Sequence, residues 1–192
     1  MGAADELPRF QPATRAAWRA WLAEHGATDT GVWVVTFKRS TGKASPSYDD
    51  LVEECLCFGW VDSKSKGLDD ERTMLLVTPR KPGGGWSRPN KLRVEKLSAA
   101  GALTPAGLAV IDAAKADGSW TLLDAVEALE PPPDLLAALA ASPAAEVAWQ
   151  TFSASARKQI LLWLVTAKKP ATRAARIAET VRQAAAGKPA RS

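Results

Sequence analysis

Residues 48–64 read YDDLVEECLCFGWVDSK, and this stretch contains a helix, its end and the start of a strand. Ser47, just before it, is of a residue type that caps helices, and the two aspartates after the tyrosine suit the positive end of a helix dipole. The apolar residues recur at helical spacing and predict one buried face: Leu51, Val52, Cys55 and Phe58. Gly59 ends the helix, and residues 60–66 then alternate in polarity as a half-exposed strand does. The stretch therefore predicts a helix that leads directly into a strand.

The neighbouring segments extend this pattern to a small sheet with helices. Residues 14–25 have apolar side chains at helical spacing and predict an amphipathic helix. Residues 31–39 (GVWVVTFKR) are rich in β-branched and aromatic residues and predict a strand. Residues 72–77 (RTMLLV) predict another strand, and a turn at residues 67–70 joins it to residues 60–66 as a hairpin. We therefore expect a small α/β domain with a short antiparallel sheet.

The second half of the sequence has helix signals only. The three consecutive prolines at residues 131–133 interrupt it, since no helix interior or central strand accommodates them. Helices are predicted on both sides of the prolines, over residues 87–101, 104–118, 134–141, 143–152, 154–168 and 170–187. We expect the α+β fold class with two domains, an α+β domain at residues 1–130 and a helical module at residues 131–192.

The composition is typical of a soluble globular protein, with 46% hydrophobic and 24% charged residues in a chain of 192. The longest apolar run, residues 160–165, is far shorter than the roughly 20 residues of a membrane helix. Residues 1–10 lack the apolar stretch of a secretory signal, so we expect a cytoplasmic protein with both cysteines reduced. The formal net charge is +4, and bases are concentrated in residues 80–96 and 157–182. One side of the surface should therefore favour anions.

The motifs of several common enzyme classes are missing from the sequence. It contains no GxSxG, no GxxxxGK[ST] and no GxGxxG segment. With one histidine, His25, and no CxxC pair, it offers no zinc site, and we expect neither a metal nor a cofactor. Whether the protein is an enzyme stays open at this point.

A glycine-rich segment at residues 78–87 (TPRKPGGGWS) is a candidate anion site. Glycine backbone ahead of a helix start at Ser87 presents N–H groups and a positive dipole end to an anion. Three bases would surround it: Arg80, Lys81 and Arg88. A mobile surface loop is the alternative. Trp60 and Trp86 lie at element boundaries beside polar residues, where a ring can line a pocket. Other tryptophans fall on helical stripes and are expected in the core: Trp18, Trp21, Trp149 and Trp163.

Several segments together resemble the YdeI/OmpD-associated (OmdA-like) bacteriocin-protection family. They are residues 18–22 (WRAWL), 31–38 (GVWVVTFK), 48–64, 78–90 (TPRKPGGGWSRPN), 114–120 (AKADGSW) and 167–177 (AKKPATRAARI), which span nearly the whole chain. The resemblance implies a YdhG-like α+β domain followed by a helical OmdA-type module. It also implies a link to resistance against bacteriocins and cationic peptides, without a catalytic residue set. The glycines at residues 83–85 depart from the family, whose loop commonly reads PRKPKSxWS.

Our leading hypothesis is a cytoplasmic binding protein for a small anionic ligand. The ligand would contact Trp60, Asp62, Lys64, Arg80, Lys81, Trp86, Ser87 and Asn90. The alternative is an enzyme that acts on such a ligand in the same pocket, with Asp62 as acid or base and Lys64 or Arg80 stabilising charge.

A second alternative is a nucleic-acid or polyanion binder that uses the last helix. Lys169, Arg173 and Arg176 share one side of this helix, while Ile177 marks its buried side. The competing interpretation is that acidic residues of the first domain, at positions 49–54 or 69–71, neutralise the helix and dock the two modules together.

Overall fold

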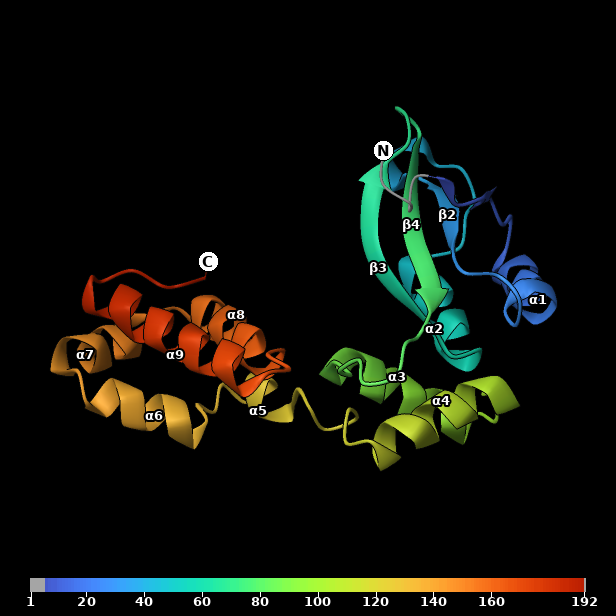
Figure 1. The fold of residues 1–192 in the computed structure, drawn as a ribbon. Helices are drawn as coiled ribbons and strands as arrows, with labels where there is room; N and C mark the ends of the chain where they lie inside the picture. Colours follow the sequence, from blue (N-terminus) through green and yellow to red (C-terminus); the bar gives the residue numbers. More distant parts are fainter. Residues whose placement is uncertain (1–5, 192) are drawn as a thin grey trace. The chain divides into compact units, whose positions relative to one another are not determined.

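The computed structural model describes residues 6–191, which form two compact units (Figure 1). The first unit comprises the described residues up to Gly84 together with Pro89–Trp120, and the second comprises Gly85–Arg88 and the residues from Thr121 onward. The cytoplasmic expectation rests on residues 1–10, of which the first five lie outside the described residues. Helices and a four-stranded mixed sheet confirm the α+β class.

The first unit is built on a sheet with the strand order β1-β2-β4-β3. Its strands are β1 (Arg9–Phe10), β2 (Val32–Phe37), β3 (Trp60–Gly67) and β4 (Arg72–Pro79). The predicted hairpin is confirmed, because β3 and β4 pair antiparallel, and β4 pairs antiparallel with β2. The sheet is nevertheless mixed, since β1 pairs parallel with β2. A two-residue strand has no periodicity that the sequence could reveal.

Helices α1 (Arg15–His25) and α2 (Tyr48–Cys57) pack together in the first unit. Ser47 caps α2, as predicted, and it also forms a capping box with Asp50. A short 3₁₀ helix, η2 (Arg39–Thr41), precedes α2. The core between these helices and the sheet is formed by Trp18, Leu22, Val32, Val34, Leu51, Cys55, Trp60, Leu75 and Val77.

Helices α3 (Arg88–Ala99) and α4 (Pro105–Ala116) follow the sheet. The start of α4 meets the end of α2, where the backbone N–H and the hydroxyl of Thr104 both donate to the Cys57 carbonyl, at 3.1 and 2.6 Å. Gly107 permits this approach, because a Cβ there would lie 2.3 Å from the same carbonyl oxygen. The contact satisfies one of the carbonyls that a helix end leaves without a partner.

The second unit is helical. It contains α5 (Asp124–Glu127), α6 (Pro133–Ala140), α7 (Pro143–Thr151), α8 (Ala154–Val165) and α9 (Pro170–Ala185). The side chains of Leu135, Trp149, Ile160 and Leu164 are among those that form its core. The change of unit falls after Trp120, so the three prolines lie within the second unit, and Pro133 begins α6. Within residues 6–191, none of the helices combines the length and apolar character that a membrane span requires.

Candidate functional site

The residues predicted for the anion pocket are divided between the two units. Trp86 and Ser87 belong to the second unit, and the other six belong to the first: Trp60, Asp62, Lys64, Arg80, Lys81 and Asn90. The Trp60 side chain is fully buried, and its indole N–H donates to the Gly26 carbonyl at 3.0 Å. Trp60 is thus a core residue, which corrects the expectation that its ring faces a ligand. Trp86 is also buried, with 1% of its surface exposed.

Five polar residues of the first unit form what we call the Asp62 cluster: Tyr48, Asp62, Arg80, Asn90 and Arg93. The Tyr48 hydroxyl donates to Asp62 Oδ2 at 2.7 Å. Arg93 donates to Asn90 Oδ1 at 3.2 Å, and its charge acts on the Tyr48 phenol. Burial lowers the pKa of Arg80 to about 10, and the charge of Asp62 opposes this shift. The cluster therefore unites three predicted residues with two, Tyr48 and Arg93, that the sequence did not reveal.

Each member of the Asp62 cluster is positioned by a different part of the first unit. Tyr48 is the first residue of α2, Asp62 lies in β3, and Asn90 and Arg93 lie in α3. Arg80 follows β4, where its backbone N–H donates to the Gly59 carbonyl at 3.0 Å. In contrast, the predicted residues Lys64 and Lys81 are exposed.

A cavity of about 240 Å³ lies beside the Asp62 cluster, with Tyr48 in its wall. It is lined by Thr36, Tyr48, Leu51, Ser65, Thr73, Met74 and Leu75. The serine and threonine side chains come from all three long strands, and Tyr48 and the apolar side chains come from α2 and β4. A pocket of this size and mixed lining suits a small ligand that offers hydrogen-bonding groups.

Tyr48 offers a direct spectroscopic test of this geometry, because it is the only tyrosine in the chain. Partial loss of hydration and the hydrogen bond to Asp62 raise its pKa to about 12, although 54% of the residue surface is exposed. We expect the absorbance of the phenolate near 295 nm to appear with a midpoint close to pH 12, and Asp62→Asn to move the midpoint toward the ordinary value of about 10. A wild-type midpoint near 10, unchanged in the variant, would contradict the hydrogen bond.

The glycine-rich segment binds a carboxylate of the protein itself. The Gly83 backbone N–H donates to Asp117 Oδ2 at 3.1 Å, within the first unit. Hydrogen bonds from Ser119 and from the Gly83 amide hold the pKa of Asp117 below its usual value. The amide that the sequence suggested for an external anion is therefore already in use.

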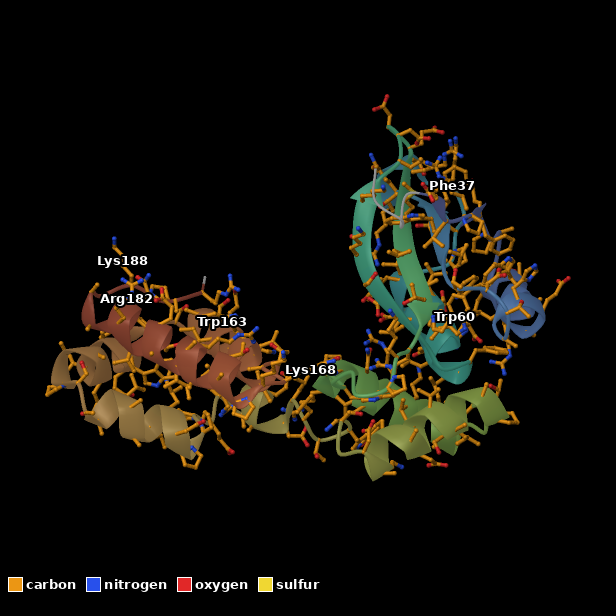
Figure 2. The ribbon with its side chains drawn as sticks, viewed as in Figure 1. Phe37, Trp60, Trp163, Lys168, Arg182 and Lys188 are labelled. Atoms are coloured by element: carbon orange, nitrogen blue, oxygen red, sulfur yellow. The ribbon has the colours of Figure 1, made fainter. Side chains whose placement is uncertain are left out.

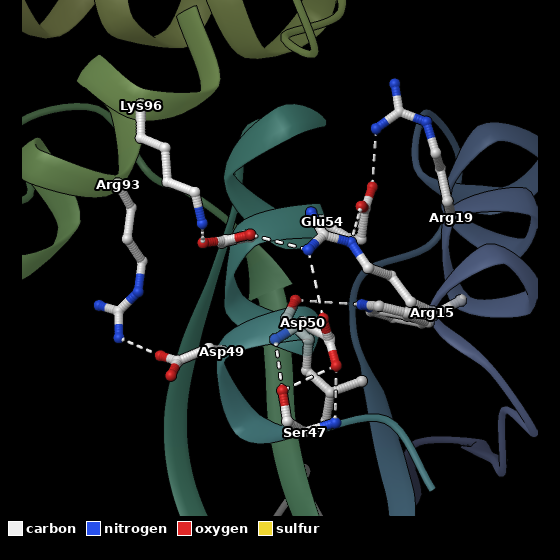
Figure 3. A network of polar contacts seen from close by, with 11 residues as sticks. Arg15, Arg19, Ser47, Asp49, Asp50, Glu54, Arg93 and Lys96 are labelled. Atoms are coloured by element: carbon white, nitrogen blue, oxygen red, sulfur yellow. Dashed lines mark hydrogen bonds and ion pairs between the residues drawn. The ribbon is translucent and has the colours of Figure 1, made fainter. Parts of the chain in front are cut away.

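The acidic residues of α2 form an ion-pair network with bases of their own unit (Figure 3). Glu54, with 3% of its surface exposed, accepts from Arg15 Nε at 2.6 Å and from Arg19 at 2.7 Å. Glu53 pairs with Arg15 at 2.8 Å and with Lys96 at 2.7 Å. Further along the chain, Asp69 pairs with Arg72 at 2.6 Å and Glu71 pairs with Lys43 at 2.7 Å. The acidic segments at residues 49–54 and 69–71, which we considered as docking partners for the last helix, thus form ion pairs with bases of the first unit.

Two of the three bases predicted to bind a polyanion are held by contacts within the second unit. Arg173 pairs with Asp134 through two hydrogen bonds, of 2.6 and 2.9 Å. Arg176 donates to the Trp163 carbonyl and to the Thr166 hydroxyl, and so caps the end of α8. Lys169, just before α9, is exposed. The two arginines spaced i, i+3 therefore both contact other parts of the second unit.

The expectation of no metal site concerns the remaining polar groups, which can be compared over the described part of the chain. Within residues 6–191, no group of three or more His, Cys, Asp and Glu side chains is placed to hold a metal ion. Cys55 and Cys57 are free and buried, and burial raises the pKa of both thiols.

Comparison with known families divides the chain in a similar way. Residues 10–110, slightly more than half of the chain, match the family model of a domain of unknown function, DUF8412. The chain belongs to the DUF8412 family. In this DUF8412 protein, residues 128–187 match the family described as bacteriocin-protection, YdeI or OmpD-associated. This match confirms the predicted resemblance for the helical part. We expected the resemblance to span nearly the whole chain, but the family model matches residues 128–187. No curated protein and no solved structure shows a significant match.

Proposed function

We propose that the protein binds a small anionic ligand at the Asp62 cluster and in the adjoining cavity. The observation that carries this proposal is the cavity in whose wall Tyr48 lies, because the Tyr48 hydroxyl donates to Asp62 at 2.7 Å. Arg80 belongs to the same cluster, and burial lowers its pKa to about 10 while the charge of Asp62 opposes this shift. A guanidinium with little hydration suits an anionic ligand, because charge-assisted hydrogen bonds are strong in such surroundings.

The lining of the adjoining cavity supports a ligand that combines an anionic group with hydroxyl or carbonyl oxygens. The cavity beside Tyr48 offers the hydroxyls of Thr36, Ser65 and Thr73 as hydrogen-bond partners. We further propose that the protein acts in the cytoplasm and that ligand binding serves protection against bacteriocins. The bacteriocin-protection module at residues 128–187 and the two free thiols support these steps.

Titration of the full chain with inorganic phosphate, followed by isothermal calorimetry and by amide shifts in NMR spectra, tests the proposal. Loss of a charge-assisted hydrogen bond costs about 1.5–3 kcal/mol, so we expect Arg80→Gln to weaken binding about tenfold or more. The matched control is Arg39→Gln, which removes an exposed charge in η2 and should change affinity less than about twofold. Equal effects of both variants, or no shifts at the Asp62 cluster, would refute the site.

Asp62→Asn separates binding from catalysis. In a binding protein, removal of this carboxylate beside Arg80 should leave anion affinity equal or improve it several-fold, since a repulsive charge is lost. In an enzyme that uses Asp62 as acid or base, the same change should abolish turnover. Weaker phosphate binding by Asp62→Asn would contradict the proposed arrangement.

A further inference from the structure

The net charge of the protein lies entirely in its second unit. The first unit contains fifteen Lys and Arg residues and fifteen Asp and Glu residues, whereas the second contains ten and six, so the net charge of +4 belongs to the second. Ion pairs occupy part of these bases, including Lys158 with Glu127 and Arg173 with Asp134. Among the described residues, seven bases of the second unit have no carboxylate within ion-pair distance: Arg88, Arg157, Lys168, Lys169, Arg176, Lys188 and Arg191. The second unit can therefore attract polyanions.

One of these bases, Arg191, lines a surface hollow of about 420 Å³, which we call the Trp163 hollow. It is lined by Gln159, Leu162, Trp163, Thr166 and Arg191. In Figure 2, Trp163 is labelled between Lys188, toward one end of the second unit, and Lys168, at the other end. Trp163 is half-buried, which corrects the expectation of a core residue, and 41% of the Leu162 surface is exposed.

Two guanidinium groups lie against the Trp163 ring. The central carbon of Arg191 is 4.8 Å from the ring centroid, and that of Arg176 is 5.2 Å away. Arg176 is fixed by its hydrogen bonds to the Trp163 carbonyl and the Thr166 hydroxyl. Arg191 is held by the ring without a carboxylate partner among the described residues, so its donors are oriented and available.

We propose that the Trp163 hollow binds a nucleotide of a single-stranded nucleic acid. A base stacks on the Trp163 and Arg191 pair and contacts Leu162, while the Gln159 amide reaches the polar edge of the base. A neighbouring phosphate contacts Arg191, and the other bases of the second unit add long-range attraction. This site is independent of the Asp62 cluster, which lies in the first unit.

The shape and chemistry of the hollow favour a nucleic acid over other anionic partners. A helix that binds a lipid surface presents a projecting apolar face, whereas Trp163 lies within a hollow and is only partly exposed. An acidic peptide would satisfy the bases but has no planar ring system to match a tryptophan and guanidinium stack. A flat apolar wall, an amide and free bases together match a base and its phosphates.

Fluorescence anisotropy of a labelled twelve-nucleotide oligothymidine with the full chain tests this inference. Arg191→Gln should weaken binding about five- to tenfold and reduce the dependence of log affinity on log salt by about 0.7. Trp163→Leu should weaken binding at least about fivefold, since stacking contributes about 1–3 kcal/mol per base. The matched control is Arg182→Gln, because this exposed arginine is paired with Glu179 at 2.7 Å, and we expect a change below about twofold.

Several outcomes would overturn the proposal. Equal weakening by Arg191→Gln and Arg182→Gln would show attraction by net charge alone. Equal affinity for a duplex of the same length would exclude a stacked base. Binding to phosphatidylglycerol vesicles without binding to the oligonucleotide would assign the surface to membranes. Trp163→Leu removes a half-buried side chain, so the circular dichroism spectrum of this variant must first be shown to match that of the wild type. Arg191→Gln changes an exposed residue and leaves the core intact.

Discussion

Gly107→Ala is expected to destabilise the first unit by about 3 kcal/mol or more. Helix propensity alone predicts the opposite, since alanine stabilises a helix by about 1 kcal/mol relative to glycine. The added Cβ, however, would lie 2.3 Å from the Cys57 carbonyl oxygen, so α4 must move away from α2. That movement also disrupts both hydrogen bonds from Thr104 to the same carbonyl.

Thermal and urea denaturation, followed by circular dichroism, measure this effect. Gly67→Ala is the matched control, because no atom lies within 4 Å of a Cβ at that position and its backbone does not require glycine. We expect the control to change the free energy of unfolding by less than about 0.5 kcal/mol. A Gly107→Ala variant as stable as the wild type would show that α2 and α4 do not approach as closely as described.

Glu54→Gln is expected to cost about 3 kcal/mol of stability. The Glu54 carboxylate is buried and is the acceptor for both Arg15 and Arg19 (Figure 3). An amide keeps its shape but replaces one acceptor oxygen with a donor that faces a guanidinium, and the loss of a buried ion pair is strongly destabilising. The matched control is Glu71→Gln, because Glu71 is half-exposed in its pair with Lys43 and should contribute at most about 0.5 kcal/mol. Equal effects in urea denaturation would contradict a structural role for the network.

The same network makes stability depend on pH in a defined direction. Hydrogen bonds from Ser47, and then from Arg15, lower the pKa of Asp50, and those from Lys96 and Arg15 lower the pKa of Glu53 against the opposing effect of burial. Carboxyls with a lowered pKa in the folded state stabilise it fully above their unfolded pKa of about 4 and lose this contribution as pH falls below it. Stability should therefore decline at acidic pH, and less steeply in Glu53→Gln.

The elements of the first unit that the sequence predicted are those with local signals. Helix α2 has its cap at Ser47 and its stop at Gly59, and the hairpin of β3 and β4 has a turn between two patterned segments. Strand β1 could not be predicted, because its two residues depend on pairing with β2, more than twenty positions along the chain. Local sequence signals thus predict individual helices and strands, whereas the arrangement of the sheet depends on pairing between residues far apart in the chain.

The candidate site was only partly predictable for the same reason. Trp60 has polar neighbours in sequence, yet the approach of the Gly26 carbonyl gives its indole a buried partner. Arg173 and Arg176 have the spacing of a cationic face, but contacts with Asp134 and the end of α8 fix them within their unit. Tyr48 and Arg93 were missed because their partners are distant in sequence, as with Arg93 and Asp49, which lie 44 positions apart. Composition identifies which groups are charged, and the fold decides which remain available.

The position of β3 at the edge of the sheet also affects association between copies of the chain. The N–H and C=O groups on the outer side of an edge strand can pair with a strand of another molecule, which is a common route to polymerisation. Ser63, Lys64, Ser65 and Lys66 are exposed along this strand, and its register with β4 shifts between Asp62 and Ser65. Two ammonium groups and an irregular backbone oppose the addition of an identical strand, because like charges would face one another and the hydrogen-bonding groups would not align. The edge that helps to form the Asp62 cluster is thereby kept from templating fibrils.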